Sequence, residues 1–215
     1  MAIVYKTTLK PSKMELLSAW LPSRPWYQGT DSAPELVKAG GFRLDDPAGE
    51  VGLEFYVARH GAGERATAYH APMTYQGAPL DGAGDALIGT TEHGVLGHRW
   101  VYDATRDPLF AVLVAALLRG EAEPMAASVN DTPDPTVRVG PYGGAGEADG
   151  FTASDDVDGT VVRIGAGERA IAVRVHRVLV PVTDPAPGPG QVSAPWRLDD
   201  DAQVRGVFLS AGPGE

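Results

Sequence analysis

The chain has 215 residues, of which 43% are hydrophobic, and its formal net charge at pH 7 is −10. This length and composition allow a substantial core, in one large domain or in two small halves. The acidic balance argues against a nucleic acid or an anionic membrane as a partner, because both require concentrated positive charge. The absence of cysteine excludes disulfides, thiolate nucleophiles and cysteine-ligated metal sites.

No basic-then-apolar leader opens the sequence, and no apolar run approaches the length of a membrane span. We therefore expect a cytoplasmic protein. The first predicted element is a strand over 3–9, followed by a break at Pro11. Ser12 and Glu15 then form the S-x-x-E pattern of a capping box, which predicts a short helix that ends at Leu21-Pro22.

Trp26 and Tyr27 follow this helix directly after Pro25. Two aromatic residues beside a proline either form a stacking platform for a ligand or anchor the loop onto the core. Strands are then predicted over 35–44, 51–59 and 65–75, because these runs are bounded by turn residues. The third of these strands places Tyr69 and His70 on a β surface.

The most polar and aromatic stretch runs from Asp85 to Asp107, and it predicts a hairpin. If residues 94–97 form its loop, the glycines at both ends supply the positive φ angles that a tight turn needs. This register pairs His93 with His98, Glu92 with Arg99, and Thr91 with Trp100. A slip of one residue would exchange the two faces of the hairpin.

This hairpin holds most of the candidate site residues. Two opposed histidines, His93 and His98, would be able to share a metal with Asp103 or Asp107 as a third ligand. Alternatively, one histidine caps the apolar face by a hydrogen bond and the other is exposed. The candidate catalytic residues are His70, Glu92, His93 and Asp103. The candidate ligand-binding residues are Trp26, Tyr69, Arg99, Trp100 and Tyr102.

A second helix is predicted directly after the hairpin. Asp107 is suited to the N-cap, Pro108 to the first helical position, and Gly120 to the stop. The whole pattern predicts a β-rich α+β fold with an antiparallel sheet and two main helices. We expect an α+β region over 1–120, a flexible linker over 121–149, and an antiparallel β region over 150–215 that packs on the first as one compact unit.

One hexapeptide occurs twice. Gly-Ala-Gly-Glu-Arg-Ala covers both 61–66 and 165–170, each time between predicted strands. Because hairpin turns reuse the same glycine chemistry, the repeat indicates either an internal duplication or a turn sequence used twice.

Several motifs resemble, in order and spacing, the N-terminal cap domain of actinobacterial maltokinases. The resemblance covers roughly residues 5–118. The motifs that carry it are Thr7-Thr8-Leu9, the segment 11–17, Ala19-Trp20-Leu21-Pro22, Pro25-Trp26, the segment 42–52, Tyr69-His70, the segment 72–75, the segment 87–90, Glu92-His93, the segment 95–97 and the segment 99–103.

The resemblance implies a cap built on a curved, cystatin-like antiparallel sheet with helices. In such kinases the cap precedes an intermediate subdomain and a kinase lobe that uses ATP and magnesium to phosphorylate maltose or, in relatives, glucosamine. These 215 residues contain no H-x-D catalytic loop followed by Asn and no D-F-G-like metal site. The resemblance is therefore closer to short stand-alone cap-like proteins, and the glycosidase barrel of a glucan-branching enzyme is not part of the pattern.

Two functions follow from this interpretation. The first is a non-catalytic binding or regulatory module of trehalose, maltose or glycogen metabolism, which needs no cofactor and acts through a partner protein or a bound sugar. The second is a small enzyme acting on a sugar or a sugar phosphate, in which His70, Glu92, His93, Asp103 and Arg99 surround a pocket roofed by Trp100. The oligomeric state is left open.

Overall fold

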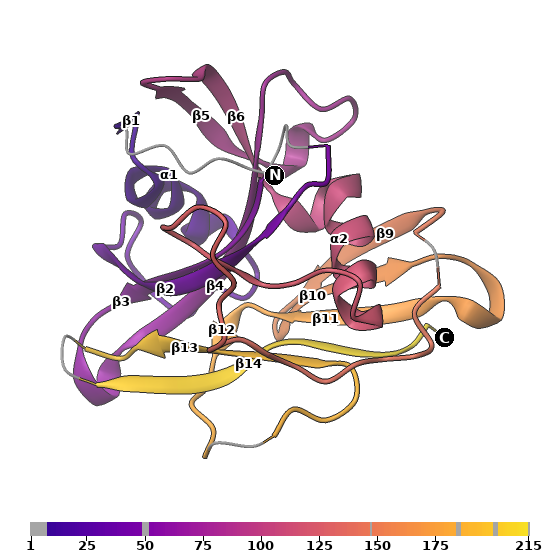
Figure 1. Cartoon of the computed structure of the whole chain (residues 1–215). Coiled ribbons are helices and arrows are strands. Elements are labelled where there is room, and N and C mark those ends of the chain that lie inside the picture. Colours follow the sequence, from indigo (N-terminus) through magenta and orange to yellow (C-terminus); the bar gives the residue numbers. More distant parts are fainter. Residues whose placement is uncertain (1–7, 49–51, 147, 184–185, 200–201, 215) are drawn as a thin grey trace.

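A computed structural model describes residues 8–48, 52–146, 148–183, 186–199 and 202–214 (Figure 1). The described residues form two α-helices, fourteen strands and five short 3₁₀ helices. The first part of the chain holds β1 (Leu9–Lys10), α1 (Lys13–Trp20), η1 (Leu21–Ser23), β2 (Leu36–Asp45), β3 (Gly52–His60), η2 (Gly63–Arg65), β4 (Thr67–Gln76), η3 (Gly84–Ala86), β5 (Leu87–His93), β6 (Gly97–Asp103), η4 (Ala104–Arg106) and α2 (Pro108–Arg119). The second part holds β7 (Met125–Ala126), β8 (Arg138–Val139), β9 (Phe151–Asp156), β10 (Gly159–Ile164), η5 (Gly167–Arg169), β11 (Ile171–His176), β12 (Val178–Leu179), β13 (Gln191–Arg197) and β14 (Gln203–Pro213).

All the strands join one antiparallel sheet, in the order β1-β5-β6-β4-β3-β2-β13-β14-β11-β10-β9. Three two-residue strands lie off this path: β12 pairs with β4, β7 with β2, and β8 with β13. The predicted β-rich α+β class with two helices is thereby confirmed. The predicted strand over 3–9 falls mostly outside the described residues. Within the described part, Leu9 lies in β1.

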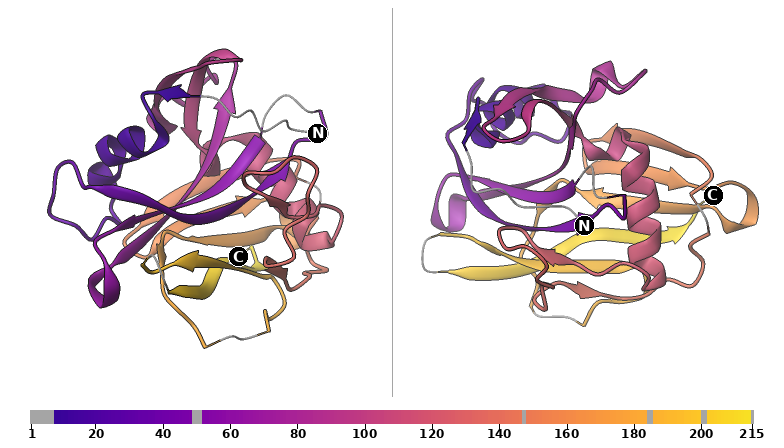
Figure 2. Two further views of the ribbon diagram at one scale, coloured as in Figure 1. Left: turned by 60° about the vertical axis from the view of Figure 1, so that its left-hand side comes forward. Right: turned by 45° about the horizontal axis from the view of Figure 1, so that its top comes forward.

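Strand β3 is buried on both faces, so the sheet supports two cores. Its odd-numbered residues Leu53, Phe55 and Val57 belong to the core on the α2 side, and its even-numbered Tyr56 and Ala58 belong to the core on the α1 side. Figure 2 shows α2 lying across the strands. Because neighbouring residues of a strand point to opposite faces, a strand between two layers is apolar throughout, as β3 largely is.

The predicted helix signals are confirmed. The Ser12 hydroxyl accepts from the backbone N–H of Glu15 at 3.3 Å, and the Glu15 carboxylate accepts from the backbone N–H of Ser12 at 2.7 Å. Helix α2 has Asp107 as its N-cap, Pro108 in its first turn, and Gly120 in the left-handed conformation at its end. Asp107 also accepts hydrogen bonds from two β4 side chains, Thr74 and Gln76, which fixes the start of α2 against the sheet.

The predicted register of the β5–β6 hairpin is wrong by one residue. His93 pairs with Gly97, Glu92 with His98, Thr91 with Arg99, and Thr90 with Trp100. The physical reason is that Gly97 adopts a φ of 72°, so it closes a three-residue loop from within the ladder, and does not belong to a four-residue loop. The expected Glu92–Arg99 pair is accordingly replaced by a contact between Glu92 and His98.

The repeated hexapeptide forms the same turn twice. Its copies contain η2, which joins β3 to β4, and η5, which joins β10 to β11, and the two glycines of each copy have positive φ angles. One sequence therefore serves two equivalent strand connections.

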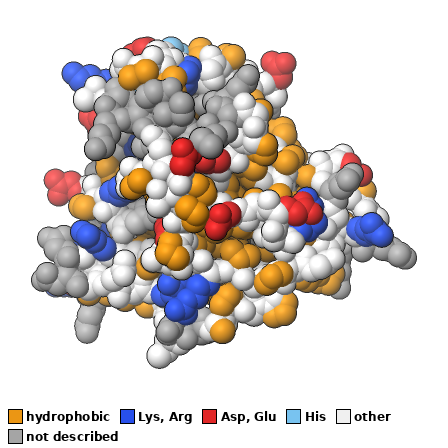
Figure 3. Space-filling model, viewed as in Figure 1, with side chains coloured by type: hydrophobic (Ala, Val, Ile, Leu, Met, Phe, Trp, Pro, Cys, Tyr) orange, Lys and Arg blue, Asp and Glu red, His pale blue; other side chains and the backbone are white. Residues whose placement is uncertain are grey.

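No helix in the described part of the chain is long and apolar enough to cross a membrane. On the face shown in Figure 3, basic side chains appear as separate spots among acidic and hydrophobic ones.

Candidate functional site

A cleft of about 700 Å³ lies where the last strand of the sheet approaches the first half of the chain. It is lined by Arg24 after η1, by the loop of residues 80–86, by residues of η4 and its flanks, and by β9. These segments are distant in sequence, so the cleft exists only in the folded chain.

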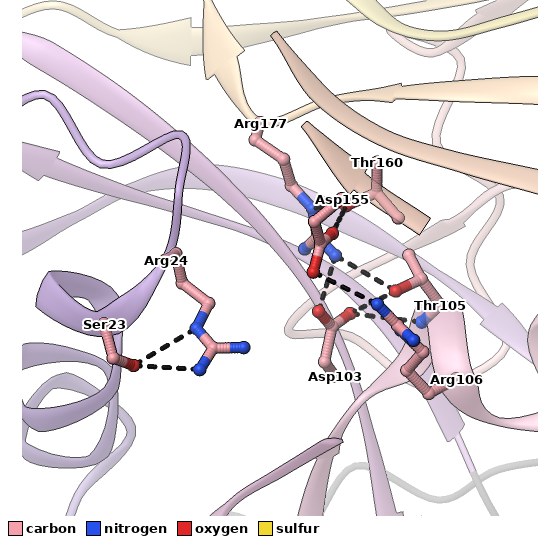
Figure 4. Close-up of polar contacts among 8 residues, drawn as sticks. All are labelled: Ser23, Arg24, Asp103, Thr105, Arg106, Asp155, Thr160 and Arg177. Atoms are coloured by element: carbon pink, nitrogen blue, oxygen red, sulfur yellow. Dashed lines mark hydrogen bonds and ion pairs between the residues drawn. The ribbon is translucent and has the colours of Figure 1, made fainter. Parts of the chain in front are cut away.

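An ion pair closes one side of this cleft. Arg106 of η4 lies with its Nη2 at 3.2 Å from Oδ2 of Asp155 in β9. The other oxygen of Asp155 accepts a hydrogen bond of 2.6 Å from the hydroxyl of Thr160, its cross-strand neighbour in β10. The Asp155 carboxylate is therefore held in one orientation by two partners (Figure 4).

The floor of the cleft is built on a fully buried arginine. Arg177 donates through Nη2 to Asp103 at 2.5 Å and to the Thr105 hydroxyl at 3.1 Å, and through Nε to the Thr160 hydroxyl at 2.7 Å. Its guanidinium also lies 5.0 Å from the centre of the Trp26 ring. A buried charge is tolerated only when it is paired and hydrogen-bonded, and Asp103 supplies that pairing.

Arg24 faces this network from the opposite wall. Its Nε and Nη2 donate to the Ser23 hydroxyl at 3.2 and 2.9 Å, and its guanidinium lies 5.0 Å from the Trp20 ring centre. Figure 4 shows the guanidinium directed across the cleft towards Asp103 and Arg106. Two contacts on one side thus orient the free edge of Arg24 towards the cavity.

The rim is formed by the loop between β4 and β5. The backbone N–H of Leu80 donates to the Tyr102 hydroxyl at 3.0 Å, which anchors the loop on β6. Beyond this anchor the exposed residues Asp81 and Asp85 line the cleft. The rim therefore presents carboxylates that are open to solvent, unlike Asp103 below.

The lining combines hydrogen-bond donors, acceptors and apolar surface. Two guanidinium groups, from Arg24 and Arg106, face four carboxylates, from Asp81, Asp85, Asp103 and Asp155. Phe151 and several alanines contribute apolar area. A concave site with a few fixed polar groups on an apolar surface is the usual form of a small-molecule binding site.

Part of the chain, including several residues that line this cleft, matches a known protein family. Residues 20–107 match the family model of the maltokinase N-terminal cap domain. Over these residues the chain is similar to that domain. The match confirms the resemblance seen in the sequence over those residues and leaves the rest of the chain unassigned. No curated protein matches the sequence.

One of the predicted site residues, Asp103, lines the cleft, and three others contact residues around it. Asp103 is in its floor, Tyr102 holds the rim loop, and Trp26 supports Arg177. Tyr69 packs on Trp26 with ring centres 6.3 Å apart and accepts from the backbone N–H of Gln28. All four are buried.

His70 lies in the core on the α2 side and has no exposed surface. Its ring packs against Phe55 and Phe208, and its Nδ1 donates to the backbone carbonyl of His176 at 3.0 Å. Burial, reinforced by the positive charge of Arg177, lowers the pKa of His70 to about 3. The neutral ring is thus the form that the core accommodates.

The remaining predicted residues of the cap stay on the hairpin, away from the cleft lining. The His93 Nδ1 accepts from the backbone N–H groups of Val95 and Leu96, at 3.2 and 3.0 Å, and so caps the turn. Burial, followed by the charges of Arg99 and Lys13, lowers its pKa, in agreement with a neutral ring that accepts hydrogen bonds.

His98 contacts Glu92 at 2.6 Å and packs edge-on against Trp100, while Arg99 donates to the carbonyl of His98. Since His93 and His98 are not opposed, the premise of the shared metal is wrong. Among the described residues, no group of three or more histidine, aspartate or glutamate side chains is placed to hold a metal ion. The structure therefore separates the catalytic candidates into the core, the cleft floor and the hairpin.

A second ionic cluster lies between α1 and the sheet. Lys13 forms an ion pair with the buried carboxylate of Glu54, which also accepts from the Tyr75 hydroxyl at 2.8 Å. Burial by itself would raise the pKa of Glu54, but the charges and hydrogen bonds of Lys13, Lys38 and Tyr75 bring it below its usual range. The cluster joins α1 to β3 and β4.

Sequence reasoning missed Arg24, Arg106 and Arg177 as parts of a site. A local signal existed for Asp155, which belongs to an aspartate pair, but adjacent aspartates in a turn are usually solvated. No local pattern marks Arg177, because its partners Asp103 and Thr160 reach it only through tertiary contacts.

Proposed function

We propose that this protein is a non-catalytic binding or regulatory module of maltose, trehalose or α-glucan metabolism. It acts through a bound sugar or through a partner protein of that metabolism. The link to this metabolism comes from the cap domain over residues 20–107, whose family is named for maltokinases.

The observation that carries the proposal is that the cap itself builds most of the cleft. Arg24, the loop of residues 80–86, Asp103 and Arg106 all belong to the matched region. The unassigned second half completes the cleft with β9 and fixes its floor with Arg177. A cap domain and a small-molecule cleft thus coincide in space.

The way the polar groups are held supports binding over catalysis. Asp103 is already bound by Arg177 and Thr105, and His70 is enclosed in the core. Among the described residues that line the cleft there is no histidine, the side chain best suited to proton transfer near neutral pH. Fixed carboxylates and guanidinium groups are well suited to hydrogen-bonding a ligand.

The test separates binding from turnover on one sample. Melting temperature is measured across maltose, trehalose, glucosamine and their phosphates, and each mixture is then examined by NMR for product, with and without ATP and magnesium. We expect at least one ligand to raise the melting temperature saturably, since a ligand at a hundred times its Kd adds about 2.7 kcal/mol to the free energy of unfolding. Every ligand should be recovered unchanged. Phosphorylated or hydrolysed product in any of these mixtures would refute the non-catalytic proposal. If no ligand raises the melting temperature, the protein acts through a partner protein and not through a bound sugar.

A further inference from the structure

The cleft has hydrogen-bonding capacity that the fold does not use. Within the described residues, Arg106 contacts Asp155 through one nitrogen, and Arg24 contacts Ser23 through two. A guanidinium carries five N–H donors, so both arginines keep donors for a ligand. Asp85 on the rim is exposed and has no role in the packing of the core.

The acceptors and donors alternate around the cavity. Arg106 lies beside Asp155, and Arg24 faces them from the other wall (Figure 4). A sugar hydroxyl both donates and accepts, so a ring with neighbouring hydroxyl groups uses a carboxylate and a guanidinium together. Phe151, Leu80 and Pro108 supply the apolar surface against which the C–H groups of a sugar ring pack.

The balance of charge narrows the class of ligand. The lining holds four carboxylates and two guanidinium groups, and Arg177 neutralises Asp103 from below. The remaining excess of negative charge opposes a phosphate or another anion. The two guanidinium groups on facing walls supply hydrogen-bond donors, which a bare cation cannot use. A ligand without charge but with many hydroxyl groups uses both the donors and the acceptors.

The volume agrees with this class. At about 700 Å³ the cleft is within the range of roughly 300–1,000 Å³ that is usual for small-molecule sites. Asp155 is fixed by Thr160 and Arg106, and Asp103 by Arg177 and Thr105, so the polar groups are oriented before the ligand arrives. Such preorganisation lowers the entropy cost of binding.

We infer that this cleft binds a neutral sugar of one or two rings. Arg24 and Arg106 donate to its oxygens, Asp155 and Asp85 accept from its hydroxyl groups, and Phe151 packs against a ring face. The inference rests on the proposed function for the choice of α-glucosides as ligands, and it adds the site, the charge class and the role of each residue.

Isothermal titration of the whole chain with maltose and trehalose tests it, alongside glucosamine and inorganic phosphate as charged probes. Arg24→Gln and Asp85→Asn remove one donor group and one acceptor without opening the buried network below. We expect each variant to weaken sugar binding at least tenfold. The matched controls are Arg197→Gln on β13 and Glu123→Gln after α2, which are exposed and outside the cleft lining, and they should bind as the wild type does.

A second measurement locates the ligand independently of the variants. In ¹H–¹⁵N spectra, added maltose should shift the amide signals of residues 80–86, 103–106 and 151–155. Sugar binding that persists in both variants, or shifts confined to other regions, would overturn the assignment of the cleft and leave the proposed function standing. Tighter binding of phosphate or glucosamine than of either neutral sugar would overturn the charge class. No binding of any sugar to the wild type would overturn the inference and leave only the partner-protein form of the proposed function.

Discussion

Arg177 has no solvent-exposed surface, and its guanidinium connects the two halves of the chain. It follows β11, yet its strongest partner, Asp103, ends β6. Its backbone carbonyl also accepts from the N–H of His70 in β4 at 2.8 Å. Desolvating a guanidinium and a carboxylate is costly, and that cost is offset only while both partners remain.

Replacing Arg177 by Met should therefore destabilise the protein strongly. The change roughly keeps the side-chain volume but leaves the Asp103 carboxylate buried without its cation, for which we expect a loss of about 3–5 kcal/mol. Urea denaturation measures the free energy of unfolding. The exposed Arg197→Met serves as a control and should stay within about 0.5 kcal/mol of the wild type. A loss below about 1 kcal/mol in the Arg177 variant would mean that the buried pair is not a structural requirement.

His70 should make stability depend on pH. Its pKa falls from 6.5 to about 3 on folding, so below pH 6.5 the unfolded chain binds a proton that the native chain excludes. Stability from this group is complete above pH 6.5 and is lost as the pH falls towards 3. Between pH 7 and pH 5 the loss amounts to roughly 2 kcal/mol.

Urea denaturation at pH 7 and pH 5 isolates this effect in His70→Gln, whose amide can still donate to the His176 carbonyl but does not titrate. The variant should lose less stability than the wild type on acidification, whatever its stability at pH 7. His60→Gln, which removes a partly exposed histidine, should behave as the wild type does. Equal losses in wild type and His70→Gln would contradict a neutral, buried His70.

At the scale of single elements, the β5–β6 hairpin depends on one backbone conformation. Gly97 has a φ of 72°, and a Cβ at this position would have open space around it. An alanine there is opposed only by the left-handed backbone, which costs about 1–2 kcal/mol. Gly97→Ala should reduce the free energy of unfolding by that amount. Gly143→Ala is the control, since Gly143 also has open space and its φ lies outside the left-handed range. Equal effects of the two changes would show that the turn conformation is not limiting.

Local sequence signals predicted the helix ends correctly but not the register of this hairpin. The capping box of α1 and the Asp107, Pro108 and Gly120 signals of α2 act within one helical turn, and the structure contains all of them. Hairpin pairing depends on which glycine adopts a positive φ, and the predicted loop has a glycine at each end. Gly97 adopts the positive φ inside the ladder, so every residue pair differs from the predicted register by one position, and Glu92 pairs with His98.

At the scale of the whole molecule, the cleft is the feature least visible in sequence. It joins Arg24, the loop of residues 80–86, η4 and β9, and these meet only because β9 at the far end of the sheet comes to lie beside η4. Composition and periodicity predict that such strands form, but the approach of two sheet ends depends on the summed twist of all the strands between them. Asp103 was found from sequence because it lies in a dense polar stretch, whereas Arg177 was not.

The core on the α2 side is shared by both halves, and this leads to a prediction about folding. Phe42 lies 5.8 Å from Phe208 and His70 lies 4.7 Å from Phe208, measured between ring centres. The same sheet continues from β2 to β13. We therefore expect one cooperative unfolding transition for the whole chain. In hydrogen exchange at increasing urea, the amides of β3 and β11 should lose protection together.

The fragment 1–120 provides the matching test. Without β13, β14 and β11, its α2-side core would lose Trp196, Phe208 and the valines that cover it, and an apolar face would be left in water. The fragment should bind a hydrophobic dye and show no sharp urea transition, and adding 121–215 as a separate chain should restore both properties. A fragment that unfolds cooperatively by itself, with β3 protected as in the full chain, would show instead that the cap is an independent domain and that the second half merely packs upon it.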